Sequence, residues 1–553
     1  MPPCAPPLRD ASLAFPRTSG DVPTDGPALD RARSSLAARV AAATAPDGLL
    51  RAPCDSRLLE SSLALHLLTA LDVDPGTQER LARHLKTGVD EGAPDPFQEA
   101  TARAALGEYV DGAAAVDRLL GRFPHFTAGR KRLMFGTILA ELGAHPHLPL
   151  TESPAPFDAR GQQRWLVTEM TALKVLHAVG TGAPGTVTED DWRTLAPSAR
   201  PGPPPYGNHL ARLLGLLALR HSPRHAPPVR ARAAEVREWL RPDGGMPFIT
   251  GMDVFATATG GLALAGAGAP PHTLLPLAEA LTRQQNPDGG WGFDRSVAQS
   301  DIDDTSYCVE FLRTTAHRVR PDGVTDVVRA VAAGEGYLTV RRGGDGGFPT
   351  FERGTDSEPA MTAAAVNALA PRPGFASVVE PAVRFLLDRE AAGGPYERSW
   401  SLNESNALFR TVLALDSFRA SVPSRHPALA DVARARARAV ARLVSTQRED
   451  GGWGHVPGEP SDPISTAYAL IAVARTPSAR DHARRAVRHL LARQRPDGGF
   501  DSRPDQAGPR PLAYHVPLLT DVCVLLGLNQ AAATPTTPHA PTTPPTPMTE
   551  ETR

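Results

Sequence analysis

The chain has 553 residues, with 59 Lys and Arg against 60 Asp and Glu and a formal net charge of -1. Because this balance leaves no basic excess to neutralise a phosphate backbone, it argues against nucleic acid as a partner. The length exceeds what one compact core usually holds and predicts two or three domains.

The N-terminus and the cysteines indicate a protein of the cytoplasm. The first residues lack the basic start and apolar run of a signal peptide, and no apolar stretch is long enough to span a bilayer. Cys4, Cys54, Cys308 and Cys523 are isolated, with no spacing typical of a zinc site or a disulfide framework. We therefore expect free thiols in a reducing compartment and no membrane insertion.

Helical spacing of apolar residues dominates the chain. The N-terminal segment mixes proline with polar residues until a helix is expected to begin near Asp30. Apolar residues then recur at helical spacing, for example over 58–68 and 432–444. After Asn529 the chain becomes rich in Ala, Thr and Pro, which predicts a disordered tail at 531–553. The sequence predicts an all-α protein.

A short turn motif divides these helices at intervals of roughly 50 residues, enough for a helical hairpin. Its copies are Asp243-Gly244-Gly245-Met246, Asp288-Gly289-Gly290-Trp291, Asp345-Gly346-Gly347-Phe348, Asp450-Gly451-Gly452-Trp453 and Asp497-Gly498-Gly499-Phe500, with a degenerate copy at Gly393-Gly394-Pro395-Tyr396 and a weaker one at Pro46-Asp47-Gly48-Leu49. Gln285, Gln447 and Gln494 stand before three of them. Paired glycines permit the positive φ of a tight turn, and the aspartate can bond local amides. Repeated hairpins stack into a solenoid or close into a double ring.

Three carboxylates follow the Trp291 copy. They are Asp301, Asp303 and Asp304, and they fall within a stretch of four residues. Carboxylates this close cannot all ionise independently, so one of them can stay protonated as an acid. Alternatively, Ser300 or Asp301 caps a helix that runs through Tyr307, and acidic residues suit its first turn. The position of the cluster directly after the Trp291 copy is harder to explain by capping alone.

The stretch Asp301-Ile302-Asp303-Asp304-Thr305 resembles the Asp-Xaa-Asp-Asp motif of the class II terpene cyclases, and the repeats resemble their Gln-Trp motifs. The resemblance extends over about residues 45–529. It implies two α/α barrels. Residues 43–254 would form one barrel (γ), inserted after the first helix of the other barrel (β), which would comprise 1–42 and 255–530.

The resemblance implies that Asp303 protonates a carbon-carbon double bond, with Asp301 and Asp304 tuning it. Such a carboxyl must be neutral before transfer, which burial and neighbouring negative charge favour, and hydrogen bonds then stabilise the carboxylate that forms. The resulting cation needs aromatic faces, which attract positive charge without capturing it. The candidates for this substrate-binding role are Trp291, Trp400, Phe248, Tyr307 and Tyr514, of which Trp291 and Trp400 are favoured. Each alone could instead be a core residue.

A diphosphate needs cationic anchors. Arg130, Lys131 and Arg132 stand at an expected helix start, where backbone amides and basic side chains could meet an anion. The alternative is a solvated basic face. The family implies Mg²⁺, for which Glu60 is a candidate ligand and Asp55 a weaker one, whereas Glu189-Asp190-Asp191 fits a helix start better.

The predicted function is therefore that of a class II terpene cyclase that folds a linear prenyl diphosphate into a bicyclic drimane- or labdane-type diphosphate. The Asp-Asp-Xaa-Xaa-Asp motif of class I synthases is absent from the sequence, so the diphosphate is expected to remain in the product. Near Trp400, copalyl diphosphate synthases often carry a histidine and paired tyrosines. This chain has Ser401, Asn403, Ser405 and Asn406 there, which favours farnesyl over geranylgeranyl diphosphate.

Three other readings remain open at this point. A squalene-hopene-type cyclase shares the acidic motif and the repeats but is usually longer and carries an apolar membrane-docking patch. The β subunits of protein prenyltransferases also form an α/α barrel but need zinc. A non-catalytic binding scaffold of helical repeats would leave the three aspartates without a role.

Overall fold

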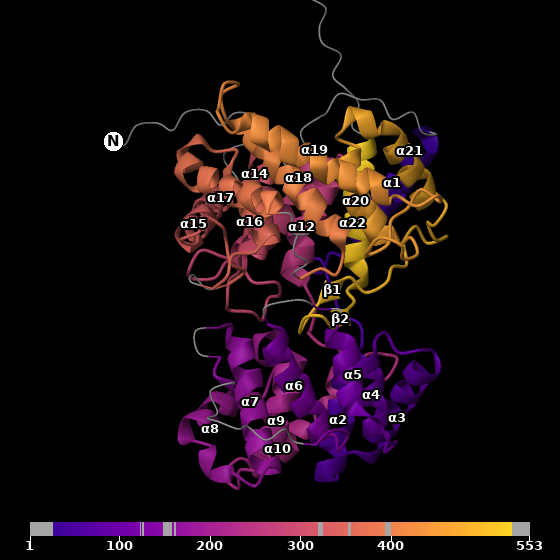
Figure 1. Ribbon diagram of the computed structural model, residues 1–553, viewed down its shortest axis with the longest axis vertical. Helices are drawn as coiled ribbons and strands as arrows, with labels where there is room; N and C mark the ends of the chain where they lie inside the picture. The colour runs from indigo at the N-terminus through magenta and orange to yellow at the C-terminus, as the bar shows by residue number, and fades with distance from the viewer. Residues whose placement is uncertain are drawn as a thin grey trace, which may run out of the picture.

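The computed structural model describes residues 26–532, except 122, 124–126, 147–156, 160–161, 319–324, 352–354 and 393–399. Within these residues the regular secondary structure is helical, apart from isolated bridges and one antiparallel hairpin of β1 (Gln506–Ala507) and β2 (Ala513–Tyr514). This confirms the all-α prediction. The helices form two lobes, one above the other, with the hairpin between them (Figure 1). None of the helices in the described ranges is both long and apolar enough to cross a bilayer.

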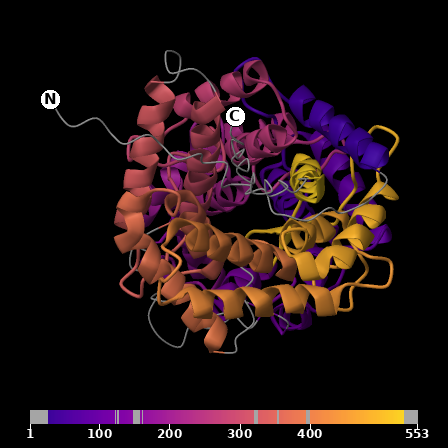
Figure 2. The ribbon, with the colours of Figure 1, turned by 90° about the horizontal axis from the view of Figure 1, so that it is seen from above.

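The upper lobe is a double ring of helices, seen from above in Figure 2. Its inner ring consists of α12 (Asp253–Gly266), α14 (Ile302–Arg318), α16 (Pro359–Leu369), α18 (Glu404–Ser421), α20 (Pro463–Val473) and α22 (Pro517–Ala532). Each of these helices packs against the next, and α22 packs against α12, so the ring is closed. Buried residues surround these helices on most sides, as their near-continuous apolar and small residues require.

The outer ring alternates with the inner one along the chain. It consists of α1 (Gly26–Ala42), α13 (Pro271–Arg283), α15 (Thr325–Arg341), α17 (Ala376–Ala391), α19 (Leu429–Thr446) and α21 (Arg480–Leu491). These helices are amphipathic: α19 buries Val432 and Leu443 while Arg434 and Arg438 stay exposed. Helix α1 packs against α22 and α21, which brings the first described helix beside the last.

The lower lobe repeats this plan with shorter helices. Its inner helices are α2 (Leu58–Leu71), α4 (Pro96–Ala105), α6 (Ala128–Glu141), α7 (Arg164–Gly180) and α9 (His209–Leu219), each packed against the next, with α9 packed against α2. Around them lie α3 (Pro75–Asp90), α5 (Gly112–Leu120), α8 (Glu189–Leu195), α10 (Ala226–Ala233) and α11 (Val236–Trp239). Short 3-10 turns are η3 (Pro184–Thr186), η4 (Ala196–Ala199), η5 (Pro205–Gly207), η7 (Pro373–Phe375) and η8 (Pro477–Ala479). The acidic run Glu189 to Asp191 begins α8, with Thr188 completing a capping box, as the sequence indicates.

Each lobe has its own hydrophobic core. The upper core includes Leu29 to Leu50 and resumes at Val254, and the lower core begins at Ala52 and also takes in Leu512 to Leu519. The lower lobe is therefore an excursion from the upper one. On this ground we propose residues 43–254 as an inserted domain and 1–42 with 255–530 as the other domain.

The Asp-Gly-Gly turns connect an outer helix to the next inner helix. In each described copy the first glycine has a φ between 84° and 91°, a region that other residues rarely adopt. At Gly289 an added Cβ would also lie 2.7 Å from the carbonyl oxygen of Ala333. Asp288 Oδ1 accepts from the Gly290 amide at 3.1 Å, and Gln285 Nε2 donates to the carbonyls of Gly289 and Ala330. The weak copy at Gly48 makes the same turn, whereas the copy at 393–396 lies outside the described residues.

Candidate active site

An aromatic cavity of about 660 Å³ lies where the two lobes meet. We call this space the apolar cavity. It is lined by Trp165, Tyr206, Asn208, Phe248, Ile249, Met252, Phe255, Phe293, Asp301, Asp303, Asp304, Thr350, Phe351, Trp400, Gln506 and Tyr514. The lining combines aromatic and aliphatic surface with three carboxylates at the start of α14. This composition suits a hydrocarbon that is to be protonated.

Three of the aromatic residues proposed from the sequence line this cavity: Trp400, Phe248 and Tyr514. Trp400 meets Trp165 edge-on with ring centroids 6.4 Å apart. It also meets Phe351 edge-on at 5.8 Å. Trp165 and Phe351 were not predicted, because they stand in no motif and come from different lobes.

Trp291 does not line the apolar cavity. Its side chain is fully buried, its Nε1 donates to the Leu281 carbonyl at 2.7 Å, and its amide donates to Thr305 Oγ1 at 3.0 Å. These bonds anchor the turn between α13 and α14. The structure therefore places Trp291 in the core, as the alternative reading of the sequence proposed.

Tyr307 lies behind the apolar cavity rather than on its wall. Its ring meets Phe255 edge-on at 5.4 Å and lies 5.3 Å from the guanidinium carbon of Arg410. It lines a second space of about 790 Å³ inside the upper ring, which we call the barrel cavity. That Tyr307 contacts substrate, from this second space, stays a prediction.

Asp301 and Asp304 are buried and joined to each other. Asp301 Oδ1 accepts from the Asp304 amide at 2.8 Å, so Asp301 caps α14 as the alternative reading proposed. Burial raises the pKa of both carboxyls, and the hydrogen bond between them further raises the pKa of Asp304. Asp304 Oδ1 has no hydrogen-bond partner within the described residues. Only one of the two carboxyls readily ionises.

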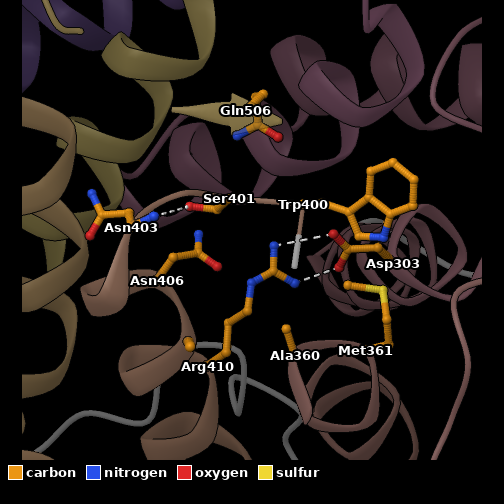
Figure 3. Close-up of a pocket in the computed structure, with 10 residues that line it drawn as sticks. Asp303, Ala360, Met361, Trp400, Ser401, Asn403, Asn406, Arg410 and Gln506 are labelled. Carbon is orange, nitrogen blue, oxygen red and sulfur yellow. Dashed lines mark hydrogen bonds and ion pairs between the residues drawn. The ribbon is translucent and has the colours of Figure 1, made fainter. Parts of the chain in front are cut away.

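Asp303, by contrast, is paired with a cation. Arg410 on α18 donates from Nη1 to Oδ1 at 2.5 Å and from Nη2 to Oδ2 at 3.2 Å (Figure 3). Burial opposes the charge of Arg410, but the Asp303 carboxylate together with Tyr307 and Tyr468 raises the pKa of Arg410 above its ordinary value. No spacing in the sequence indicated this pair.

A smaller polar space of about 350 Å³ adjoins the pair. Besides Asp303 and Arg410 it is lined by Ala360, Met361, Trp400, Ser401, Asn403, Asn406, Ala407 and Gln506, and we call it the polar cavity (Figure 3). Gln506 lines all three cavities, and Arg410 lines the polar and barrel cavities. Of the four residues singled out in the sequence as departing from copalyl enzymes, Ser401, Asn403 and Asn406 therefore line the cavity beside the Asp303–Arg410 pair, whereas Ser405 does not.

Four cations gather beside the apolar cavity, and we call Arg57, Arg130, Lys131 and Arg510 the basic cluster. Burial lowers the pKa of Lys131, Glu169 opposes this, and the charges of Arg130 and Arg510 lower it further. Arg57 lies 4.3 Å from the Phe248 ring, and Arg510 lies 5.0 Å from the Trp400 ring. Because both rings line the apolar cavity, the cluster borders it.

Two candidates from the sequence have partners of their own. Arg132 points away from the cluster, is half-exposed and pairs with Asp117 on the surface. Glu60 is fully buried, and Arg57 donates to both its oxygens, at 2.7 Å to Oε2 and 2.5 Å to Oε1. Both Glu60 oxygens are thus already engaged by Arg57, which makes Glu60 less suited to hold a metal ion. The weaker candidate Asp55 contacts His515 instead.

The described residues contain no group of three or more His, Cys, Asp or Glu side chains that could hold a metal ion. One carboxylate near the basic cluster has an oxygen without a hydrogen-bond partner among the described residues. Glu169 Oε1 accepts from Asn208 at 3.2 Å, while its buried Oε2 has no partner in the described part of the chain. Burial raises the pKa of Glu169 despite nearby Lys131.

Comparisons with known proteins bear on the whole chain. No family model matches it. The drimenyl diphosphate synthase of Streptantibioticus cattleyicolor is 54% identical over 527 residues, which cover 93% of this chain and 97% of that protein. The drimenyl diphosphate synthase of Streptomyces showdoensis is 53% identical over 92% of this chain and 96% of its own length. The solved ent-copalyl diphosphate synthase of Streptomyces platensis matches 91% of this chain with a TM-score of 0.56 at 18% identity, which shows a shared fold.

Proposed function

The chain belongs to the drimenyl diphosphate synthase family of class II terpene cyclases, and on that premise we propose that it cyclises farnesyl diphosphate to a bicyclic drimane-type diphosphate. The observation that carries this proposal is the apolar cavity, which borders both the Asp303 carboxyl and the basic cluster. A prenyl diphosphate matches this arrangement, because it has an alkene to be protonated at one end and an anionic diphosphate at the other. The rival readings of the sequence, including the squalene-hopene type, lose their support because the relatives span nearly the whole chain.

The basic cluster is the proposed seat of the diphosphate. Lys131 is buried and Arg130 is largely so, and the Arg130 Nε atom has no partner among the described residues. A dianion placed there gives these cations the charge that burial now denies them. Binding of the diphosphate should therefore raise the pKa of Lys131 and draw a proton from solvent.

Asp303 is the proposed proton donor. In its protonated form it would give its proton to the terminal alkene and become a carboxylate. Arg410 is already aligned to hold that carboxylate with two hydrogen bonds. Asp301 fixes the start of α14, and Asp304 adds negative charge or a proton beside the donor. Trp400, with Trp165 and Phe351 around it, offers aromatic faces and keeps water from the cation.

Magnesium is proposed as the companion of the diphosphate. Mg²⁺ commonly takes one or two protein carboxylates together with substrate phosphate oxygens and water. The unpartnered Oε2 of Glu169 fits that requirement better than Glu60, whose oxygens both accept from Arg57. When bound, the ion would offset the negative charge of the diphosphate. We propose the cytoplasm as the place of work, because Cys54, Cys308 and Cys523 are free thiols.

The proposed function is tested by incubating the protein and Mg²⁺ with farnesyl or geranylgeranyl diphosphate, followed by phosphatase treatment and mass spectrometry of the alcohols. A bicyclic C15 alcohol from farnesyl diphosphate, absent with Asp303→Asn, is the expected result. A bicyclic product from geranylgeranyl diphosphate alone would overturn the chain length. Linear alcohols from both substrates would overturn the proposal.

A further inference from the structure

A second buried carboxyl lies on the face of α14 that carries Asp303. Glu310 is seven residues further along the helix, about two turns or 10 Å of rise. Its side chain is only 8% exposed and lines the barrel cavity. Within the described residues its carboxyl makes neither a hydrogen bond nor an ion pair. The proposed mechanism gives it no role so far.

Arg410 acts on both carboxyls. Its guanidinium is bonded to Asp303 and lies over the ring of Tyr307, the residue between Asp303 and Glu310 on this helix face. Arg410 lines the polar cavity with Asp303 and the barrel cavity with Glu310. One cation thus faces two carboxyls and is bonded to only one.

The charges around Glu310 explain why it can hold a proton. Burial raises the pKa of Glu310 to about 7, against the opposing effects of Arg313 and Arg410. Arg313 is engaged elsewhere, because it donates to the Ala368 carbonyl at 2.6 Å and lies 3.6 Å from Glu335. The charged or titratable groups that line the barrel cavity with Glu310 are Tyr307 from α14, Arg410 from α18, Tyr468 from α20 and Cys523 from α22. Arg313 and Asp303 act on Glu310 from its own helix, α14, without lining that cavity. The lining residues of α12 and α16 are not titratable.

We propose that Glu310 is the proton reservoir for Asp303 and that Arg410 alternates between the two carboxylates. In the loading step the O–H bond of Glu310 breaks and an O–H bond forms on Asp303, with water in the cavities carrying the proton. The two N–H···O bonds of Arg410 pass from Asp303 to the new Glu310 carboxylate, so the total charge is unchanged. The inference rests on the proposed role of Asp303 as donor and explains how a carboxylate paired with arginine becomes an acid. Glu310 acts through Asp303 and is a positioning residue.

The first test needs no substrate and therefore stands apart from the proposed function. Infrared difference spectra at pH 6 between wild type and Glu310→Gln should show a protonated carboxyl band from Glu310. In an Asp303→Ala background Arg410 is free to pair with Glu310, so the same comparison should show that band lost. A band that persists unchanged without Asp303 would overturn the alternation. If Glu310→Gln does not fold, Glu310→Asp marks the same group by a shifted band.

The second test uses turnover of farnesyl diphosphate. Glu310→Gln should lower kcat at pH 7 by roughly tenfold or more and move the alkaline fall of kcat to lower pH by about one unit, with KM unchanged. Glu310→Asp should restore most of the rate. The matched control is Glu335→Gln, which removes another buried carboxyl beside Arg313 and should keep the wild-type profile. A wild-type pH profile in Glu310→Gln would overturn the reservoir.

Discussion

Arg410 holds both oxygens of Asp303, at 2.5 and 3.2 Å, across 107 residues of sequence. An arginine at this distance stabilises the carboxylate, which is the state of the donor after proton transfer. The pair therefore favours the end of the proton transfer over its beginning, and loading of Asp303 becomes a step of its own.

Replacing Asp303 with Asn should abolish cyclisation and leave the fold intact. Asn keeps the size of the side chain and can still accept a bond from Arg410, but it carries no acidic proton. Rates should fall by about 10²–10⁴-fold or below detection. Product analysis by mass spectrometry measures the loss, and Asp326→Asn at the exposed start of α15 is a control that should retain activity. Substantial turnover by the Asp303 variant would place the donor elsewhere.

Replacing Arg410 with Met should slow turnover by about 10²-fold or more, because the carboxylate left on Asp303 then has no cation in a buried site. Arg410→Lys should recover part of the rate, since it restores the charge without the two-point bond. The measurement is kcat at saturating substrate. Equal rates for wild type and the Met variant would show that the pair does not contribute to proton transfer.

Replacing Lys131 with Met should raise KM for the prenyl diphosphate by about tenfold or more while changing kcat less. Its neighbour on α6 provides the matched control: Arg132 pairs with Asp117 on the surface, and Arg132→Met should keep the wild-type KM. Steady-state kinetics compares the two. Equal KM values for both variants would contradict the proposal that the diphosphate binds at the basic cluster.

Glu310 should make stability depend on pH in a defined window. Its pKa is raised from 4.5 to about 7, so the folded chain keeps a proton that the unfolded chain loses. The contribution of Glu310 to the free energy of unfolding is fully present below pH 4.5. It falls by about 3 kcal/mol as the pH rises through 7. Urea unfolding of wild type and Glu310→Gln over this range measures the difference. A difference that stays constant with pH would contradict the assignment.

The two favoured tryptophans should respond in opposite ways. Trp291→Leu should cost about 3–5 kcal/mol of stability, because it removes a buried ring and its bond to Leu281, yet the folded fraction should make the same product. Trp400→Leu should retain most of the stability and release altered or incompletely cyclised products. Thermal unfolding and product profiles separate the two effects. A changed product from Trp291→Leu would return it to the cavity wall.

Local features of the sequence predicted much of this molecule. The Asp-Gly-Gly turns depend on a few adjacent residues, namely glycines that allow positive φ and an aspartate that accepts from a local amide. The helical hairpins and the all-α class could therefore be predicted from the sequence. The acidic cluster was visible for the same reason. Trp291 was assigned to the cavity because an aromatic in a repeat can pack or bind, and spacing alone cannot distinguish the two.

Contacts between distant segments could not be predicted. Arg410, Glu310 and Arg510 carry no motif, and their importance comes from neighbours on other helices or from the face they share. A local pair was also overlooked: Arg57, three residues before Glu60, donates to both its oxygens. Arg132 was misread because a run of basic residues on a helix points in several directions.

The adjacency of α1 and α22 has a consequence for how the protein is made. Arg39 on α1 donates to Asp521 on α22 across 482 residues, so the upper ring can close only after nearly the whole chain has left the ribosome. The lower lobe, whose core is built almost entirely from one continuous stretch, can assemble much earlier. During synthesis the apolar face of α1 therefore stays uncovered until α22 has been made. A chain cut short before α22 would leave that face and the open ring to chaperones and proteases.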